Sequence, residues 1–218
     1  MHTKESYMKV GLLGTGNLAT ALGRAWAAKA HAITVTGRSR EHAAAAIEKI
    51  GFPGVTTVPP DRFAEQADVV VVAVSWDGLT EALTLVGGPD GSLSDKTVID
   101  CTNAVDSATG RLIPSAGSAA DVVAAAALGA NVVKALHLFS GATWPYIGDP
   151  GSSPVVALSG DDATALDTTA ELVHDLGART AVLGGLATAR QAEETAAFVM
   201  RIVASGANPR FAIPDVRR

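Results

Sequence analysis

The sequence predicts an α/β fold in which helices cover both faces of a mainly parallel sheet. Strand-like segments alternate with helix-like segments along most of the chain, as they do in repeated β-α-β units. Val69–Val74 is a nearly continuous apolar, β-branched run, which is typical of a strand buried on both faces. A glycine-containing loop follows the first predicted strand directly and opens the first predicted helix. Together these observations favour a doubly wound sheet.

The predicted strands are short apolar runs separated by helical patterns or by turn-forming residues. Glycine and proline residues mark several of their ends, and residues 87–95 form a turn-rich loop before the fifth strand. In chain order, the predicted strands are residues 8–13, 33–36, 55–58, 69–74, 97–100, 132–136, 155–158 and 180–183.

The predicted helices carry apolar residues at intervals of three and four. In the first, this stripe consists of Leu18, Leu22, Ala25 and Trp26. Later helices cover residues 41–50, which Gly51 and Pro53 end, then 60–66, 79–86 and the alanine-rich segment 118–128.

Two further helices are predicted in the last third of the chain. Asp161 and Asp162 are both N-cap candidates for the first of them, and Gly177 is placed to end it. The second has a stripe over residues 192–203, which suits either a dimer face or a helix buried within one chain. The chain after Gly206 is expected to be irregular.

Composition and charge limit the class of protein. Of the 218 residues, 48% are hydrophobic and 18% charged, which is ordinary for a globular protein. The net charge of −5 argues against a general nucleic-acid role. A single cysteine, Cys101, allows no disulfide within the chain, and the polar N-terminus lacks the apolar core of a signal peptide. No apolar run is long enough to span a membrane, so a soluble, cytoplasmic protein is expected.

One segment suggests a division of the chain. Residues 139–154 are dense in glycine, proline and serine. We therefore predict a larger domain over residues 8–138, which contains the glycine loop, and a smaller C-terminal α/β subdomain over residues 139–218.

The glycine loop Gly14–Ala19 fits the pattern G-x-G-x-x-A between a strand and a helix. Gly14 permits a tight turn, Gly16 lets the backbone approach a pyrophosphate, and Ala19 permits close packing of helix and strand. The helix N-terminus then offers free N–H groups to that pyrophosphate. This context predicts a Rossmann-type dinucleotide site; the alternative is a turn that merely requires glycine.

The end of the second strand indicates which dinucleotide is bound. NAD-binding units place a carboxylate there, on the ribose 2′-hydroxyl. This chain instead has Arg38, Ser39 and Arg40, with no carboxylate before Glu41. Two guanidinium groups and a hydroxyl suit a 2′-phosphate, so NADP(H) is predicted. The alternative is a solvated basic turn.

The ends of the fourth, fifth and sixth strands are expected to surround the nicotinamide. Thr102 and Asn103 suit a ribose or a carboxamide, or they cap their own turn. Trp76 either forms a wall of the pocket or packs in the core. His137 is the best-placed titratable group; it either acts directly or is simply a satisfied polar residue. Cys101 is not predicted to be a nucleophile, because no neighbour in sequence lowers its pKa.

The chain lacks the sequence motifs of two common kinds of active site. There is no Tyr-x-x-x-Lys pair for ketone reduction, and the five histidines lack the spacing of metal ligands. No metal site is therefore predicted. Hydride transfer between two stacked rings needs little acid–base help, because the protein mainly holds two carbons at roughly 3–3.5 Å.

The chain resembles the NADPH-dependent coenzyme F420 reductases, also called F420-dependent NADP oxidoreductases. The resemblance runs from about Met8 to the last helix. The motifs that carry it are Gly14–Leu18, Gly37–Arg40, Val74–Trp76, Val132–His137 and Gly160–Asp162.

This resemblance implies a Rossmann domain with a smaller C-terminal α/β portion, usually in a homodimer, and hydride exchange between NADP(H) and a deazaflavin. It also implies roles for individual residues. Ser75 and Trp76 would lie near the cofactor, and His137 and Phe139 would line the deazaflavin pocket. Direct NADP contacts would come from Thr15, Asn17, Leu18, Ser39 and Arg40.

The chain departs from the family pattern after the histidine. Leu138–Pro145 stands where a proline-containing apolar segment is expected. The leading hypothesis is an F420-dependent NADP oxidoreductase. This departure motivates a second, an NADPH-dependent imine or carbonyl reductase of a biosynthetic pathway. The scarcity of acid–base residues motivates a third, a non-catalytic NADP(H) sensor.

Overall fold

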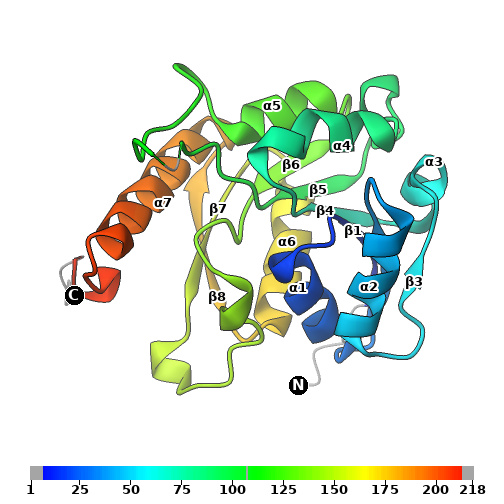
Figure 1. The fold of residues 1–218 in the computed structure, drawn as a ribbon, viewed down its shortest axis with the longest axis horizontal. Coiled ribbons are helices and arrows are strands. Elements are labelled where there is room, and N and C mark those ends of the chain that lie inside the picture. Colours follow the sequence, from blue (N-terminus) through cyan, green and yellow to red (C-terminus); the bar gives the residue numbers. More distant parts are fainter. Residues whose placement is uncertain (1–6, 107, 213–218) are drawn as a thin grey trace.

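The computed structural model describes residues 7–106 and 108–212 and shows a three-layer α/β fold (Figure 1). Within these residues the strands form one eight-stranded sheet in the order β3-β2-β1-β4-β5-β6-β7-β8. β1 to β6 run parallel, and β7 pairs antiparallel with β6. The predicted doubly wound Rossmann-type sheet is confirmed. The strands are β1 Lys9–Leu13, β2 Ala32–Thr36, β3 Thr56–Thr57, β4 Val69–Val72, β5 Thr97–Asp100, β6 Asn131–Lys134, β7 Val155–Gly160 and β8 Arg179–Gly184.

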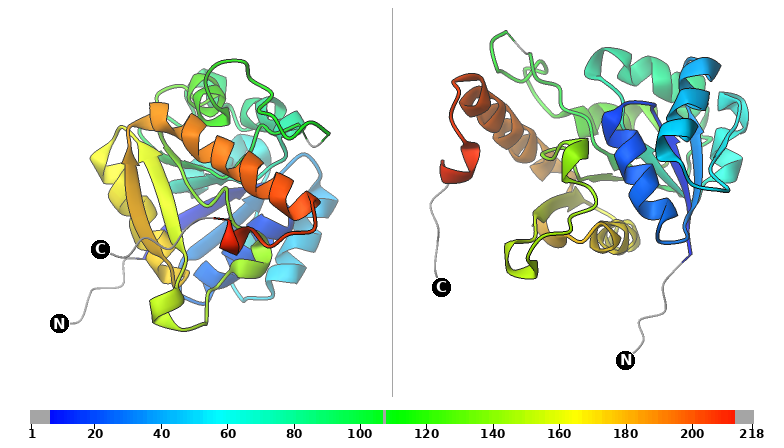
Figure 2. Two further views of the ribbon diagram at one scale, coloured as in Figure 1. Left: turned by 90° about the vertical axis from the view of Figure 1, so that its left-hand side faces the viewer. Right: turned by 60° about the horizontal axis from the view of Figure 1, so that its bottom comes forward.

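Helices cover both faces of the sheet. One core cluster joins the sheet to α1, α2 and α6, and a second joins it to α3, α4 and α5. α7 packs beside α5 and β7 (Figures 1 and 2). The helices are α1 Asn17–Ala27, α2 Arg40–Ile50, α3 Pro60–Phe63, α4 Leu79–Leu85, α5 Ala119–Ala126, α6 Ala163–Asp175 and α7 Ala189–Ala204.

Local sequence rules explain where several helices begin and end. Ser118 caps α5 in a reciprocal box with Asp121. Gly51 and Gly177, both with positive φ, follow the last residues of α2 and α6. Of the two predicted caps of α6, only Asp162 acts as one, accepting from the Ala165 amide at 2.7 Å. Asp161 instead accepts from the Leu186 amide at 3.0 Å, which ties the start of α6 to the segment before α7.

Several strands are shorter than predicted, and two of them end early at the candidate site. The strand predicted to reach Val74 ends at Val72, and the strand predicted to reach Leu136 ends at Lys134. Leu136 adopts a left-handed conformation (φ 60°), which turns the chain out of the sheet. This turn directs the next residue, His137, toward α7, where it meets the Ala192 carbonyl.

The C-terminal part of the chain continues the same sheet. β7 and β8 lie beyond β6, and α6 packs against β5, β6, β7 and β8. The predicted division at residues 138 and 139 therefore falls in a loop between strands of one sheet. None of the helices in the described ranges is long and apolar enough to cross a membrane.

Candidate functional site

The glycine loop lies at the carboxyl end of β1, where the chain turns sharply into α1. The Gly14 amide donates to the Thr36 carbonyl of β2 at 3.0 Å. Gly14 has φ 132°, and a Cβ there would lie 2.3 Å from the Ala73 carbonyl oxygen. Any side chain at Gly14 would therefore clash with the backbone that follows β4. The loop holds β1, β2 and β4 together at the edge where ligands bind in open α/β sheets.

Gly16 faces open space. A Cβ added at this position would meet no described heavy atom within 4 Å. Gly14, Thr15 and Gly16 line a pocket of about 200 Å³ together with residues that follow β2 and β4. α1 begins directly after Gly16, so its N-terminus lies beside this pocket. A bare backbone next to a helix N-terminus suits an anionic group such as a pyrophosphate.

The two other residues predicted to contact the cofactor from this loop are placed differently. Asn17 is the first residue of α1, and Leu18 is partly buried against the core cluster of α1, α2 and α6. The Leu18 side chain therefore packs partly against the core, so any contact that this residue makes with a pyrophosphate would come from its backbone.

The basic segment after β2 lies on the rim of the same pocket. Arg38 and Ser39 line it beside the glycine loop. Arg38 and Arg40 together line an adjoining groove of about 400 Å³, closed on its other side by Val58 and Pro59. The structure therefore places Arg38, Ser39 and Arg40, which we call the predicted clamp, beside two hollows. Both hollows are lined by Gly37 and Arg38.

Ser39 has a second task, because it caps α2. Its hydroxyl accepts from the His42 amide at 3.2 Å. This leaves the hydroxyl hydrogen free to donate to a ligand oxygen.

Two ionisable residues at or next to this rim were not predicted. His42 lines the pocket from the first turn of α2. Glu81 of α4 pairs with Arg38 at 2.9 Å. No sequence motif links either residue to the cofactor, because each reaches the site only through the packing of α2 and α4.

Ser75 and Trp76 follow the carboxyl end of β4, and their side chains have different surroundings. Ser75 lines the pocket. Trp76 is partly buried and packs against the core cluster of α3, α4 and α5. For Trp76 the structure therefore favours the core alternative that the sequence left open.

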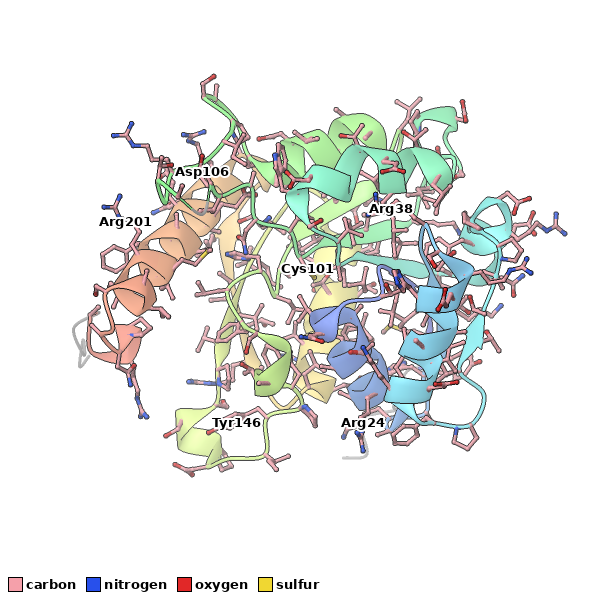
Figure 3. The ribbon with its side chains drawn as sticks, in the orientation of Figure 1. Arg24, Arg38, Cys101, Asp106, Tyr146 and Arg201 are labelled. Atoms are coloured by element: carbon pink, nitrogen blue, oxygen red, sulfur yellow. The ribbon has the colours of Figure 1, made fainter. Side chains whose placement is uncertain are left out.

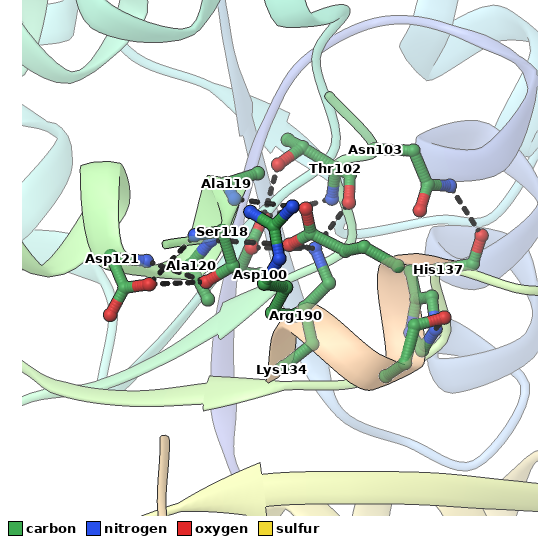
Figure 4. A network of polar contacts seen from close by, with 12 residues as sticks. Asp100, Thr102, Asn103, Ser118, Ala119, Ala120, Asp121, Lys134, His137 and Arg190 are labelled. Carbon is green, nitrogen blue, oxygen red and sulfur yellow. Dashed lines mark hydrogen bonds and ion pairs between the residues drawn. The ribbon is translucent and has the colours of Figure 1, made fainter. Parts of the chain in front are cut away.

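A fully buried ion network lies under the ends of β5 and β6 (Figure 4). Lys134 of β6 pairs with Asp100 of β5 at 2.9 Å and with Glu193 of α7 at 2.8 Å. Glu193 also accepts from the backbone amides of Ala119 (2.9 Å) and Ala120 (3.3 Å) at the start of α5. The network therefore connects the sheet, α5 and α7.

Lys134 keeps its charge despite burial. Burial favours a neutral amine, but Asp100 and Glu193 outweigh it and hold the pKa of Lys134 above its usual value. Burial, with a further contribution from Asp100, raises the pKa of the Cys101 thiol. Cys101 is therefore a protonated thiol at neutral pH, in line with the expectation that it is not a nucleophile.

The network fixes the turn that holds Thr102 and Asn103. The Thr102 amide and hydroxyl both donate to Asp100, at 2.8 and 2.6 Å, and its carbonyl accepts from Lys134. The Thr102 side chain thus faces the network and not the open site.

Asn103 carries a free polar atom beside this turn. Its amide nitrogen donates to the His137 carbonyl at 2.7 Å. Its Oδ1 is buried and has no hydrogen-bond partner among residues 7–106 and 108–212. An unpaired buried acceptor is costly, so this atom is suited to a donor from a bound molecule.

His137 is held in one orientation by α7. Its Nε2 lies 3.1 Å from the Ala192 carbonyl, and because a carbonyl only accepts, Nε2 carries the hydrogen. Nδ1 is then a buried acceptor without a partner in the described part of the chain. Burial, and next the charge of Lys134, lower the pKa of His137 to about 4. His137 is therefore a neutral imidazole at pH 7.

The low pKa of His137 predicts a pH-dependent stability. Between about pH 6.5 and pH 4 the unfolded chain binds a proton that the native His137 does not. The free energy of unfolding should therefore fall as the pH drops, by up to about 3 kcal/mol from this group. Urea denaturation at several pH values in this range gives the free energy of unfolding at each pH. In His137→Ala this free energy should change less steeply with pH than in the unmodified protein. The exposed His174→Ala is the control, and an unchanged slope in His137→Ala would contradict the assignment.

An apolar cavity of about 240 Å³ adjoins His137. His137, Leu138 and Phe139 form one side, and Gln191, Ala192 and Thr195 of α7 form another. The structure therefore brings His137 and Phe139 together in a mostly apolar hollow.

The segment after this cavity returns to the glycine loop. Phe139 and Trp144 pack edge to face, with ring centroids 5.3 Å apart. A Cβ at Gly141 would lie 2.6 Å from the Asn17 carbonyl oxygen, so this backbone packs directly against the first turn of α1. The segment that departs from the family pattern thus connects the cavity to the cofactor loop.

Comparison with known proteins gives a family match for the N-terminal part of the chain. The family described as NADP oxidoreductase, coenzyme F420-dependent, matches residues 9–104. This segment is therefore similar to the F420-dependent NADP oxidoreductases. It contains the glycine loop, the basic segment, Ser75 and Asn103, whereas His137 and Phe139 lie outside it.

Solved structures extend the similarity over most of the chain. A protein from Arthrobacter sp. FB24, provisionally assigned as an F420-dependent NADP reductase, is 28% identical with a TM-score of 0.78, covering 92% of this chain and 96% of that one. A hypothetical protein from Sinorhizobium meliloti is 26% identical with a TM-score of 0.69, covering 85% and 90%.

The imine reductase of Myxococcus stipitatus, solved with NADP⁺, is more distant. It is 16% identical with a TM-score of 0.64, and 91% of this chain covers 63% of it. This likeness shows the shared fold alone. With the family match, the findings establish an NAD(P)-dependent oxidoreductase.

Proposed function

We propose that this NAD(P)-dependent oxidoreductase exchanges a hydride between NADP(H) and a deazaflavin, coenzyme F420. The observation that carries the proposal is the state of His137, the titratable side chain at the acceptor cavity. It is neutral, and its N–H is already donated to Ala192. Such a site orients two rings but has no proton to give from this residue, which suits ring-to-ring hydride transfer.

The residues present fit NADP(H). The open backbone at Gly16, beside the start of α1, would hold the pyrophosphate. Arg38, Ser39 and Arg40 would hold the 2′-phosphate from the rim they share. When bound, NADPH supplies a hydride from C4 of its nicotinamide ring.

Asn103 supports the placement of the nicotinamide end. Its buried Oδ1 would accept from a carboxamide N–H, while its own amide stays bonded to the His137 carbonyl. Thr102 would not contact the cofactor with its side chain. It would help to position Asn103, because Asp100 and Lys134 hold the Thr102 backbone in the same turn. In this proposal Ser75 lines the cofactor pocket and Trp76 supports it from the core.

The acceptor would occupy the apolar cavity. Leu138 and Phe139 offer apolar surface to a flat ring system, and the lone pair on His137 Nδ1 offers one acceptor. The apolar lining would also exclude water from the transferred hydride.

The decisive experiment mixes the purified protein with NADPH and F420 and follows the absorbance of both. We expect NADPH oxidation to require F420, and F420 reduction to match it one to one. Binding of NADPH without any turnover of F420 over a range of near-neutral pH would contradict the proposal. Turnover of an imine or ketone panel in its place would favour the biosynthetic reductase, and no turnover with any acceptor would favour the NADP(H) sensor.

His137→Ala should separate the acceptor site from the cofactor site. Loss of the imidazole enlarges the cavity and loosens the acceptor, so kcat should fall roughly tenfold. The Kd for NADPH, measured by fluorescence titration, should stay within about twofold. His174→Ala, at an exposed position on α6, is the control. A large loss of NADPH affinity in His137→Ala would place His137 in the cofactor site instead.

The proposal includes a cytoplasmic homodimer. Met200 and Val203, which lie three residues apart on one face of α7, are about half exposed, at 45% and 57%. A second copy of the chain would cover this apolar helix face. Light scattering that shows a monomer at micromolar concentration would remove the dimer from the proposal.

A further inference from the structure

An ion pair joins the two rims of the glycine-loop pocket. Arg38 follows β2, and Glu81 lies in α4, yet their side chains meet at 2.9 Å. Gly37 and Arg38 line one rim of the pocket, while Gly78 and Ala82, on either side of Glu81 in the chain, line the other. Figure 3 shows Arg38 in the space between α2 and α4. The pair therefore crosses the region in which the predicted clamp would receive a phosphate.

This pair is weak enough to be exchanged for a ligand. The side chains of Arg38 and Glu81 are 62% and 61% exposed, so water and salt screen their attraction. A 2′-phosphate carries more negative charge than a carboxylate and has three acceptor oxygens. Since Arg38 also lines the groove that it shares with Arg40, both anions would compete for one guanidinium group.

We propose that Glu81 is a specificity-determining residue that competes with the cofactor 2′-phosphate for Arg38. This inference rests on the proposed NADP(H) site. Glu81 holds Arg38 across the pocket when no 2′-phosphate is present, and NADP(H) binds only after this pair opens. The competition lowers the affinity for NADP(H). It leaves NAD(H), which has no 2′-phosphate, unaffected.

The test compares Glu81→Gln with the unmodified protein in titrations with NADPH and NADH. The amide keeps the size of the side chain but competes far less for Arg38. We expect the Kd for NADPH to fall about two- to fivefold, which is the range that an exposed ion pair supports, and the Kd for NADH to stay unchanged. Glu194→Gln removes the same charge from an exposed pair with Arg190 on α7 and should change neither value. An unchanged or raised Kd for NADPH in Glu81→Gln would overturn the proposal.

A second pair of variants tests the route through Arg38. In an Arg38→Ala background, Glu81→Gln should no longer improve NADPH binding. An equal improvement in that background would show simple charge repulsion and would also overturn the competition. Failure of the proposed function is visible separately, since an unmodified protein that binds NADPH no better than NADH lacks the clamp itself.

Discussion

Lys134→Met should lower the free energy of unfolding by about 3–5 kcal/mol. The substitution leaves the carboxylates of Asp100 and Glu193 close together and fully buried without their cation. Neither group gains water, because the apolar side chain fills the same space. Urea denaturation measures the loss, and Lys49→Met, at an exposed position on α2, controls for a lost surface charge.

A double substitution tests the cause of that loss. If unpaired charge destabilises Lys134→Met, then adding Glu193→Gln should recover part of the stability. The same Glu193→Gln in the unmodified protein should be destabilising, because it weakens the pairing with Lys134 and the bonds to the start of α5. A loss below about 1 kcal/mol in Lys134→Met would show that the network tolerates an apolar residue.

Replacing both Arg38 and Arg40 with alanine should weaken NADPH binding by about 100-fold. Each guanidinium would donate charge-assisted hydrogen bonds to the 2′-phosphate, and partial exposure reduces their combined contribution to about 3 kcal/mol. The Kd for NADH should stay within about twofold, because its ribose carries no phosphate. Titration of both nucleotides gives the preference directly.

Arg24→Ala is the matched control for the clamp. Arg24 is an exposed arginine in the last turn of α1, at the end of the helix remote from the pocket (Figure 3). Its loss should leave both nucleotide affinities unchanged. If the double Arg38 and Arg40 variant bound NADPH as tightly as the unmodified protein, the 2′-phosphate would have to lie elsewhere.

The features that could be predicted from the sequence are those that local sequence determines. The strand–glycine–helix order around Gly14 and Gly16 follows from backbone rules that act over a few residues, and the helix stripes follow from one-face burial. The ends at Val72 and Lys134 were misplaced because the apolar pattern continues past the point where the backbone leaves the sheet. Leu136 has no local reason to adopt a left-handed conformation, so that turn was not predictable.

The buried network illustrates what one sequence does not contain. Asp100, Lys134 and Glu193 come from β5, β6 and α7, and nothing near each residue marks it as buried. Lysine and glutamate are mostly exposed residue types, so their burial depends on a partner that only the fold provides. The pairing of Arg38 with Glu81 was missed for the same reason. Asn103 and His137 were predicted from their positions at strand ends, but their mutual hydrogen bond was not.

Adjacent residues of α7 serve the two halves of the site. The Ala192 carbonyl accepts from the His137 N–H at the apolar cavity, and the neighbouring Glu193 side chain pairs with Lys134 beneath the turn at Thr102 and Asn103. Gln191 and Thr195 line the same cavity and are not members of the network. For protein engineering, α7 therefore offers variable positions beside fixed ones. Libraries at Gln191 and Thr195 would reshape the apolar cavity, while Glu193 would keep the turn at Thr102 and Asn103 in place.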